Sequence, residues 1–391
     1  MAPGCKIEDV GESVIQNELK MRLVQEHAKN CDNINNNTVK SDDINEKVTK
    51  VESDFDLAKY EAMDFKAKIR WPDLIVQVSL HTVTLYGLYL IFSNSVKFWT
   101  TLFAFVTIVT SGFGITAGVH RLWSHRAYRA RTPLRVLLAV LFTITGQRDI
   151  YTWALDHRVH HKYSETAADP HDVRRGFWFA HVGWLVLTPH PAVENRRVAL
   201  RKTSLDLLAD PVVRIQKLIF IPMFGLLNIF LPVWIPMHYW DESLVNSFIV
   251  SFVTRFTLTL NIAYCVNSFA HLWGNKPYDR FIGSAECLMV SVAALGEGWH
   301  NYHHVFPWDY RTSELGRLNL STGFIDFFAK IGWAYDRDRK TPTAGHRSSQ
   351  RSPQRPVLCL SHPPGTCDLY QIVGPPSVRP THDTYLFTLN V

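Results

Sequence analysis

The sequence lacks a cysteine framework, because its six cysteines form no Cys-x-x-Cys pair and no regular spacing. A small disulfide-stapled fold is therefore excluded, and a reducing compartment is expected. The chain also lacks the His-Glu-x-x-His motif of zinc proteases and any nucleic-acid-binding motif. Its net charge of +6 is modest, so we expect anionic headgroups or an anionic substrate as partners, and no nucleic acid.

Charged residues are nearly absent from four long stretches of the chain: 74–93, 98–119, 218–237 and 243–266. Only Arg255 interrupts the last of them. About 20 apolar residues in an α-helix cross about 30 Å of hydrocarbon. A soluble protein with buried helices is the alternative, but four such stretches argue against it. The sequence therefore predicts an all-α integral membrane protein with four transmembrane helices in two hairpins.

The regions outside these stretches predict the orientation and the domain boundaries. Residues 1–68 hold no cleavable signal and are rich in Asn, Asp, Glu and Lys, so we expect a disordered cytosolic tail. Residues 341–391 contain eight of the twenty prolines and no helical period, which predicts a second disordered tail. Basic residues crowd the long connection between the second and third stretches, and the short connection HYWDE has none. The long connection between the second and third stretches and both termini should therefore be cytosolic.

Residues 69–340 are then the membrane domain with its cytosolic helical cap. Two shorter apolar runs in it, 136–147 and 281–295, are too brief to span a bilayer comfortably. We expect them at the membrane interface or packed on the cap.

Histidines are concentrated near the predicted membrane ends. Nine of the eighteen fall into four groups, which all lie on the predicted cytosolic side: His120, His125, His157, His160, His161, His271, His300, His303 and His304. Two groups have the pattern His-x-x-His-His, which places three imidazoles on one helix face. Asn267 lies one helical turn before His271, and the wider spacing of His120 and His125 fits a helix end.

A metal site explains such a concentration, because imidazole binds iron, zinc, copper and nickel. Nine imidazoles exceed the positions around one ion, so the count predicts two metal ions that share the set. The pair of Glu-x-x-His motifs that soluble di-iron bundles use is not present, since Glu-x-x-His occurs once, at Glu297 and His300, and the spacing alone allows iron or zinc. Hydrogen-bonded polar residues at a membrane surface are the alternative, but two repeats and two flanking groups argue against it.

Residues 65 to about 340 resemble the membrane-bound acyl-CoA desaturases of the stearoyl-CoA type, insect members in particular. The resemblance rests on "GITAGVHRLWSHRAY", "DHRVHHKYSETAADPH", "RRGFWFAHVGWL", "NSFAHLWGNKPYD" and "GEGWHNYHHVFPWDY", which occur in the family's order and separations. It implies four transmembrane helices under a cytosolic cap, and two iron ions held by the nine histidines, with Asn267 acting through a water. It also implies a double bond inserted into a fatty acyl-CoA at the endoplasmic reticulum membrane.

The same resemblance implies molecular oxygen as oxidant and electrons from cytochrome b5 and its NADH-dependent reductase. No haem is expected in this chain, because the nearest match to a His-Pro-Gly-Gly haem motif is "HPPG" at 362–365, in the Pro-rich tail.

Four carboxylates beside the histidines are candidates to orient the imidazoles by accepting their second N–H: Asp156, Glu165, Asp169 and Glu297. Helix capping and surface salt bridges are the alternative roles. Four residues are candidate substrate contacts: Trp153, Asp156, Arg174 and Arg175. The two arginines are expected to meet the phosphates of CoA, although any cytosolic loop of a membrane protein is basic.

The sequence departs from the family near this headgroup site. Pro72 stands where relatives have Arg, Leu155 replaces another Arg, and Ala167 replaces an acidic or polar residue. These changes predict an altered CoA affinity or substrate choice with the metal set intact.

Three other functions remain open at this point. A histidine-box hydroxylase or conjugase would have the same ligands and differ in its product. A zinc-stabilised membrane receptor or transporter needs only three or four histidines and usually more spans, and would contain no iron. A catalytically silent desaturase relative is the third.

Overall fold

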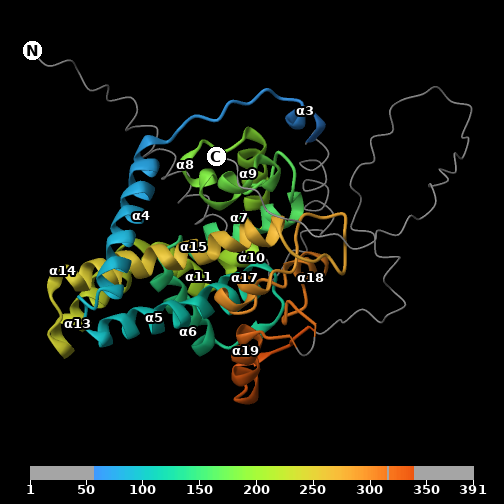
Figure 1. The fold of residues 1–391 in the computed structure, drawn as a ribbon. Helices are drawn as coiled ribbons and strands as arrows, with labels where there is room; N and C mark the ends of the chain where they lie inside the picture. The colour runs from blue at the N-terminus through green and yellow to red at the C-terminus, as the bar shows by residue number, and fades with distance from the viewer. Residues whose placement is uncertain (1–56, 315–316, 339–391) are drawn as a thin grey trace, which may run out of the picture. The chain divides into compact units, whose positions relative to one another are not determined.

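A computed structural model describes residues 57–314 and 317–338, all of which belong to one unit of the chain, Met1–Arg347. The predicted C-terminal tail, 341–391, and most of the predicted N-terminal tail lie outside the described residues. Helices make up almost all of the regular structure (Figure 1), together with one two-stranded ladder in which β1 (Arg129–Ala130) pairs antiparallel with β2 (Ala334–Tyr335).

Four helical segments are long and apolar enough to cross a membrane: Trp71–Phe92, Phe98–Ser124, Phe220–Trp240 and Leu244–Leu272. They confirm the four predicted spans, with ends that differ by a few residues. Their elements are α4 (Trp71–Phe92) in the first span, α5 (Phe98–Phe113) and η1 (Gly114–Ser124) in the second, α12 (Phe220–Phe224), η4 (Gly225–Phe230) and α13 (Leu231–Trp240) in the third, and α14 (Leu244–Asn246), η5 (Ser247–Thr254), α15 (Arg255–Asn267) and α16 (Phe269–Leu272) in the fourth.

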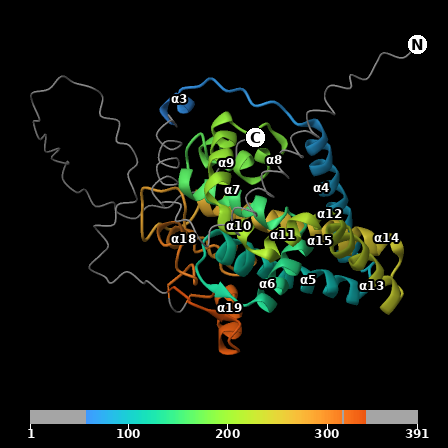
Figure 2. The same ribbon diagram turned by 180° about the vertical axis from the view of Figure 1, so that it is seen from behind.

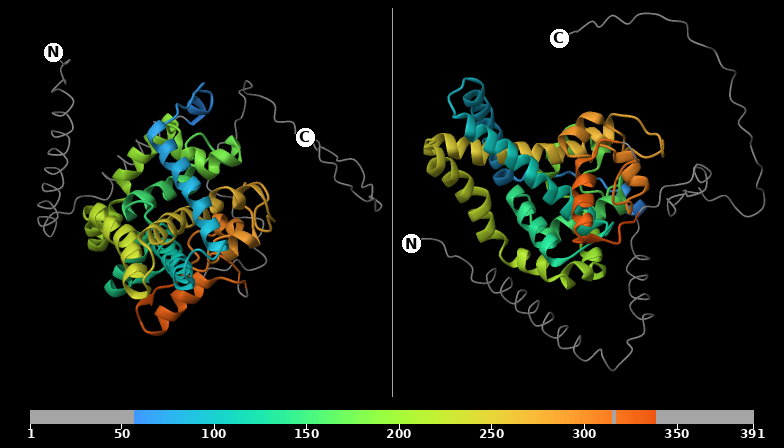
Figure 3. Two further views of the ribbon diagram at one scale, coloured as in Figure 1. Left: turned by 60° about the vertical axis from the view of Figure 1, so that its left-hand side comes forward. Right: turned by 90° about the horizontal axis from the view of Figure 1, so that it is seen from below.

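The fourth span packs against the other three. Its π-helix η5 contacts α4, α5 and α13, and α15 contacts α4 and α5; α4, in blue, is clearest in the left-hand view of Figure 3. The approach of α4 is close enough to require glycine, because a Cβ on Gly87 would lie 2.0 Å from the hydroxyl oxygen of Thr254. Small residues allow this kind of contact between membrane helices.

The remaining elements form the cap, and Figures 1 and 2 show α18 at the end of the molecule opposite α13 and α14. They are α3 (Leu57–Glu61), α6 (Thr132–Thr145), α7 (Ile150–Tyr163), η2 (Val173–Arg175), η3 (Phe179–Gly183), α8 (Trp184–Val186), α9 (Pro191–Thr203), α10 (Leu205–Ala209), α11 (Pro211–Leu218), α17 (Leu288–Ala293), α18 (His300–Val305) and α19 (Leu320–Lys330).

The main hydrophobic core joins this cap to the second span. Leu134, Leu138 and Phe142 of α6 are fully buried in it and pack with residues of η1, α7 and α19. Gly114 lets α6 approach η1, because a Cβ there would lie 2.2 Å from the backbone nitrogen of Phe142. The predicted short run 136–147 thus falls largely in a helix that packs on the cap, as expected.

The boundary of the N-terminal tail was predicted too late. Residues 57–68 are held against the cap: Glu61 accepts hydrogen bonds from Arg174 and from the backbone N–H of Ala167, and Phe65 lies edge-on to His190. Their polar composition pointed to disorder, but these contacts with distant residues order them.

A buried carboxylate joins the two turns at the opposite end of the spans. Glu242 is only 6% exposed and accepts from the backbone N–H of Lys97 at 2.9 Å and from the hydroxyl of Thr100 at 2.8 Å. It also accepts from Ser243 N–H and from the side chain of Asn246, each at 3.0 Å. Glu242 therefore ties the hairpin of the first two spans to that of the last two.

We expect Glu242→Ala to lower the thermal midpoint of the detergent-solubilised chain by roughly 5 °C or more. Each unsatisfied buried group costs about 1–3 kcal/mol, and 1 kcal/mol shifts the midpoint by about 2–4 °C in domains of 150–250 residues. Asp241→Asn is the matched control, since Asp241 is exposed with φ 52°, a conformation that Asn tolerates. Equal midpoints for both variants in a fluorescence-detected thermal assay would show that the clamp contributes nothing.

Candidate metal centre

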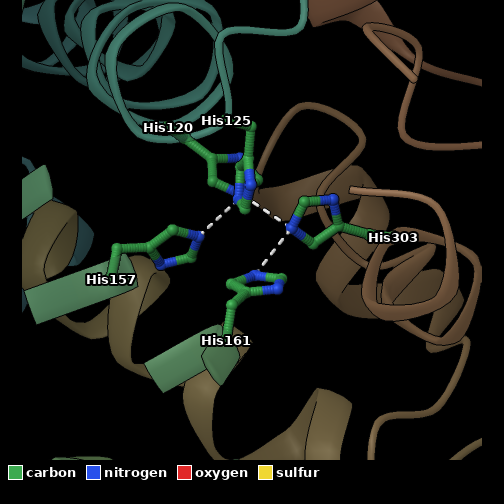
Figure 4. Close-up of side chains that lie close together, drawn as sticks. All are labelled: His120, His125, His157, His161 and His303. Carbon is green, nitrogen blue, oxygen red and sulfur yellow. Dashed lines mark hydrogen bonds between the residues drawn. The ribbon is translucent and has the colours of Figure 1, made fainter. Parts of the chain in front are cut away.

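Five histidines from three parts of the chain meet in a first imidazole group (Figure 4): His120, His125, His157, His161 and His303. One ring nitrogen from each lies within 4.8 Å of the others. The Nε2 atom of His303 lies 2.9 Å from that of His120 and 3.0 Å from that of His161. The Nε2 atoms of His125 and His157 are 2.8 Å apart.

Four histidines form a second imidazole group: His160, His271, His300 and His304. Nε2 of His300 lies 3.0 Å from Nε2 of His271 and 3.0 Å from Nε2 of His304. Nε2 of His160 is buried and has no hydrogen-bond partner. All nine predicted histidines are thus gathered, but in two sets rather than one.

Helices α7 and α18 divide their histidines between the two groups in opposite ways. In α7 the outer pair, His157 and His161, belongs to the first group and His160 to the second. In α18 the outer pair, His300 and His304, belongs to the second group and His303 to the first. Each His-x-x-His-His motif therefore serves both groups, which the spacing along one helix did not reveal.

The π-helix η1 explains the unusual spacing of His120 and His125. Its hydrogen bonds join residues five apart, and the backbone N–H of His125 donates to the carbonyl of His120 at 3.1 Å. Residues five apart therefore lie on the same side, with the two rings 4.9 Å apart. In an α-helix, residues five apart point in different directions. The predicted helix end at His120 and His125 is therefore present, but as a π-helix.

Helix α18 is held in place by side chains on the face that points away from the imidazole groups. Asn301 accepts from the backbone N–H of Tyr278 at 2.9 Å and donates to the carbonyl of Ser284 at 2.9 Å. The hydroxyl of Tyr302 donates to Asp309 at 2.8 Å. These contacts fix the direction in which the three histidines of this six-residue helix point.

Two predicted carboxylates lie behind the imidazoles. Oε2 of Glu297 is 2.9 Å from Nδ1 of His120, and Oδ1 of Asp169 is 2.8 Å from Nδ1 of His160. Burial favours the neutral acid, but the charge of the buried Arg121 and the hydrogen bond with His120 lower the pKa of Glu297 to about 2. Burial is likewise outweighed at Asp169, where His160 lowers the pKa of the carboxyl.

The other two predicted carboxylates have different partners. Both oxygens of Asp156 accept from Arg197, at 2.7 and 3.0 Å, so the prediction that Asp156 orients an imidazole is corrected: the strong bidentate contact with a guanidinium occupies it. The side chain of Glu165 accepts from the backbone N–H of Gly283. Asn267, at the end of α15, is half-buried four residues before His271, and its role as a ligand through water stays a prediction.

Six imidazoles of the two groups have a pKa lowered from its ordinary value. Burial, with smaller effects from neighbouring imidazoles, lowers the pKa well below its ordinary value at His125, His157, His161, His303 and His304. Burial also lowers the pKa of His300 to about 3. Uncharged imidazole is the form that binds metals.

The donor set fits a pair of metal ions. A carboxylate lies at Nδ1 of His120 and of His160, so Nε2 is the nitrogen that each of these rings turns into its group. Nε2 atoms that lie 2.8–3.0 Å from one another can each offer a lone pair to a cation placed between them. Two nitrogens bound at right angles to one ion at about 2.1 Å are about 3.0 Å apart.

Several contributors were missed by the sequence reasoning. His171 forms a third buried cluster with His160 and Asp169; its position two residues after Asp169 was the available signal. Arg121, fully buried, donates to Glu297 at 2.7 Å, and only its place beside His120 marked it.

The predicted substrate contacts lie in different surroundings. Trp153 stacks on His157, with centroids 5.0 Å apart, and donates to Gln147 at 2.8 Å. Arg174 binds Asp172 and Glu61. Arg175 lines a pocket with these residues: Arg70, Arg148, Asp169, Pro170, Phe179, Trp184, Thr188, Pro189, His190, Val193 and Arg197. Leu155 is buried in the hydrophobic core.

Comparison with known proteins identifies the class. Residues 96–336 match the fatty acid desaturase family model, and the chain belongs to this family. It is 49% identical over 281 residues to an acyl-CoA Delta-9 desaturase of Acheta domesticus, covering 71% of this chain and 77% of the relative.

Two further relatives are of comparable similarity. A stearoyl-CoA desaturase of Mesocricetus auratus is 49% identical over 280 residues, 71% of this chain and 78% of the relative. A (11Z)-hexadec-11-enoyl-CoA conjugase of Bombyx mori is 47% identical over 278 residues, 71% of this chain and 83% of the relative. The chain is thus an oxidoreductase of the membrane, with four spans and a buried centre suited to metal.

The division into two groups predicts how metal is lost. We expect His157→Ala with His161→Ala to remove about half of the bound metal, and His300→Ala with His304→Ala to remove the other half, because one ion needs several of the imidazoles in its group. Metal per chain, measured by plasma mass spectrometry, checks this. His238→Ala is the control, since His238 lies in the third span near the opposite end. Complete loss in both double variants would indicate one shared site instead.

Proposed function

We propose that this protein is a fatty acyl-CoA desaturase that inserts a cis double bond into a saturated long-chain acyl-CoA, with two iron ions held by the nine histidines. The observation that carries the proposal is the pair of buried imidazole groups whose Nε2 atoms face one another. Membership of the desaturase family supports it, as do the acyl-CoA substrates named for its relatives.

The residues of the centre serve to bind, orient and exclude water. An iron pair, when bound, would supply the strong oxidant, derived from O₂, that an unactivated methylene requires. Glu297 and Asp169 hold His120 and His160 in the tautomer that offers Nε2. Burial of five of the nine histidines, for example 1% exposure of His303 and 2% of His300, limits the access of bulk water to the centre.

The basic pocket is the proposed site for the phosphates of CoA. Four of its lining residues are arginines: Arg70, Arg148, Arg175 and Arg197. Guanidinium groups suit phosphate because they donate two parallel hydrogen bonds. Arg175 is proposed to be one of these phosphate contacts, because it lines the pocket. Arg174, bound to Asp172 and Glu61, is reassigned to holding η2 and α3 together.

The pocket and the centre share residues, which supports a substrate that reaches both. Asp169 lines the pocket and contacts His160 of the second group. Arg197 lines the pocket and binds Asp156, one residue before His157. Trp153 covers one face of His157, where we propose that it contacts the acyl chain. Asp156 would act on the headgroup indirectly, by fixing Arg197.

The proposed location is the endoplasmic reticulum membrane, with the cap, residues 1–68 and residues 341–391 in the cytosol. Support comes from the basic residues of the connection between the second and third spans. Residues 69–340 would be the catalytic membrane domain.

Conjugation is the second candidate, since the silkworm relative carries that name. A conjugase acts on a chain that is already unsaturated, so the two activities differ in substrate and product rather than in ligands. Double-bond mapping of products separates them.

Expression in a desaturase-deficient yeast tests the reaction. We expect the full-length protein to restore monounsaturated fatty acids, and His157→Ala or His304→Ala to abolish them while the protein stays in the membrane, because one lost ligand disables oxygen activation. His238→Ala serves as the control. Conjugated dienes formed only from supplied monounsaturated chains would favour the conjugase; activity retained in both ligand variants would indicate that the histidines are structural.

Electrons are proposed to come from cytochrome b5 and its NADH-dependent reductase. An acidic carrier would dock on the basic cap, steered by Arg and Lys. Reconstituted protein should form no unsaturated product with NADH and reductase alone and should gain activity when cytochrome b5 is added, with a rate that falls as ionic strength rises. Equal turnover without cytochrome b5 would exclude this electron source.

A further inference from the structure

A hydrogen-bonded series of buried and half-buried polar side chains crosses from the first span to the fourth, outside both imidazole groups. It joins His81 of α4, Asn261 of α15, His181 of η3 and Ser268, which follows α15. His181 is 9% exposed and Ser268 fully buried. His81 and His181 are not among the nine histidines of the centre, so the proposed function gives this series of hydrogen bonds no role.

The direction of each hydrogen bond in this series follows from the bond between His81 and Gln77. Nδ1 of His81 lies 2.7 Å from the carbonyl oxygen of Gln77, which only accepts, so Nδ1 donates and Nε2 accepts from Asn261 Nδ2 at 3.1 Å. Oδ1 of Asn261 then accepts from Nε2 of His181 at 3.2 Å. Nδ1 of His181 is left to accept from the hydroxyl of Ser268 at 2.9 Å. Burial lowers the pKa of His181, in keeping with a neutral ring that has one donor and one acceptor.

Ser268 is the residue at which the fourth span breaks. Helix α15 ends at Asn267 and α16 begins at Phe269, with φ −108° and ψ −72° at Ser268 between them. The carbonyl of Ser268 accepts from the backbone N–H of His271 at 3.1 Å. His271 in turn presents Nε2 to His300 in the second imidazole group, 3.0 Å away. The place of Ser268 thus sets the place of His271.

The Ser268 hydroxyl has a competing acceptor in its own helix. Its oxygen also lies 2.8 Å from the carbonyl of Tyr264, four residues earlier. Serine in a helix commonly makes such a bond to the residue four before it. Without His181 we expect the Ser268 hydroxyl to donate only to the Tyr264 carbonyl. The break between α15 and α16 would then have no hydrogen bond to η3.

We propose that His181 is a positioning residue for the second imidazole group: by accepting the hydroxyl proton of Ser268, it fixes the start of α16 and with it the ligand His271. The inference rests on the proposed metal centre. Ser268 is fully buried, so its hydroxyl does not reach bulk water while His181 is in place.

Two substitutions that remove the same ring test the proposal. In His181→Asn the amide oxygen takes roughly the place of Nδ1 and accepts from Ser268; in His181→Gln the amide takes roughly the place of Nε2 and reaches only Asn261. We expect His181→Asn to keep the wild-type metal content after dialysis of the full-length protein against a chelator. His181→Gln should fall to about half, because loss of an outer hydrogen bond lowers metal affinity by roughly 10–100-fold.

A serine pair keeps the test decisive if a histidine variant does not fold. Ser268→Ala should lose about half of the metal, whereas Ser251→Ala should lose none; Ser251 is fully buried in the same span and its hydroxyl has no hydrogen-bond partner. Equal metal content in His181→Asn and His181→Gln, or full metal in Ser268→Ala, overturns the inference alone. A wild-type protein that retains no metal overturns the metal centre and the inference together.

Discussion

The structure of the cap is organised around two groups of imidazoles whose Nε2 atoms face one another. Nε2 atoms from separate helices approach to 2.8–3.0 Å, and the carboxylates of Glu297 and Asp169 fix the tautomer of one ring in each group. Burying unpaired acceptors is costly, whereas a cation between them converts the cost into binding energy. Arg121, fully buried, keeps Glu297 ionised behind the first group.

The opposite use of α7 and α18 links the two groups. Each helix contributes two histidines to one group and one to the other, so a displacement of either helix disturbs both. Both helices are fixed by hydrogen bonds. Asp149 caps α7 through the backbone N–H of Thr152, and Asn301 and Tyr302 anchor α18. A reaction that needs two ions close together benefits from ligands held by shared rigid elements.

The fold was predictable where the signal is local. A stretch without charge marks a membrane span in the sequence itself, and all four were found. The nine histidines were also predictable, because His-x-x-His-His is a short-range pattern. Their division into two groups was not, since it depends on how α7 meets α18, over a hundred residues away in the sequence.

Other features escaped because partners compete through tertiary contacts. Asp156 and Arg174 were assigned to the centre and the substrate from their sequence neighbours, yet Arg197, Asp172 and Glu61 hold them. The tail boundary moved to an earlier residue because Glu61 and Phe65 contact the cap. His171 and His181 lie outside any repeated spacing, and only the fold shows what they contact.

Anomalous diffraction from crystals of the full-length protein, recorded just above and just below the iron absorption edge, tests directly whether each imidazole group binds one iron ion. Two iron peaks are expected, one inside each imidazole group. A single peak shared by both groups, an ion at the His160, Asp169 and His171 cluster in place of the second group, or no metal at all would contradict it.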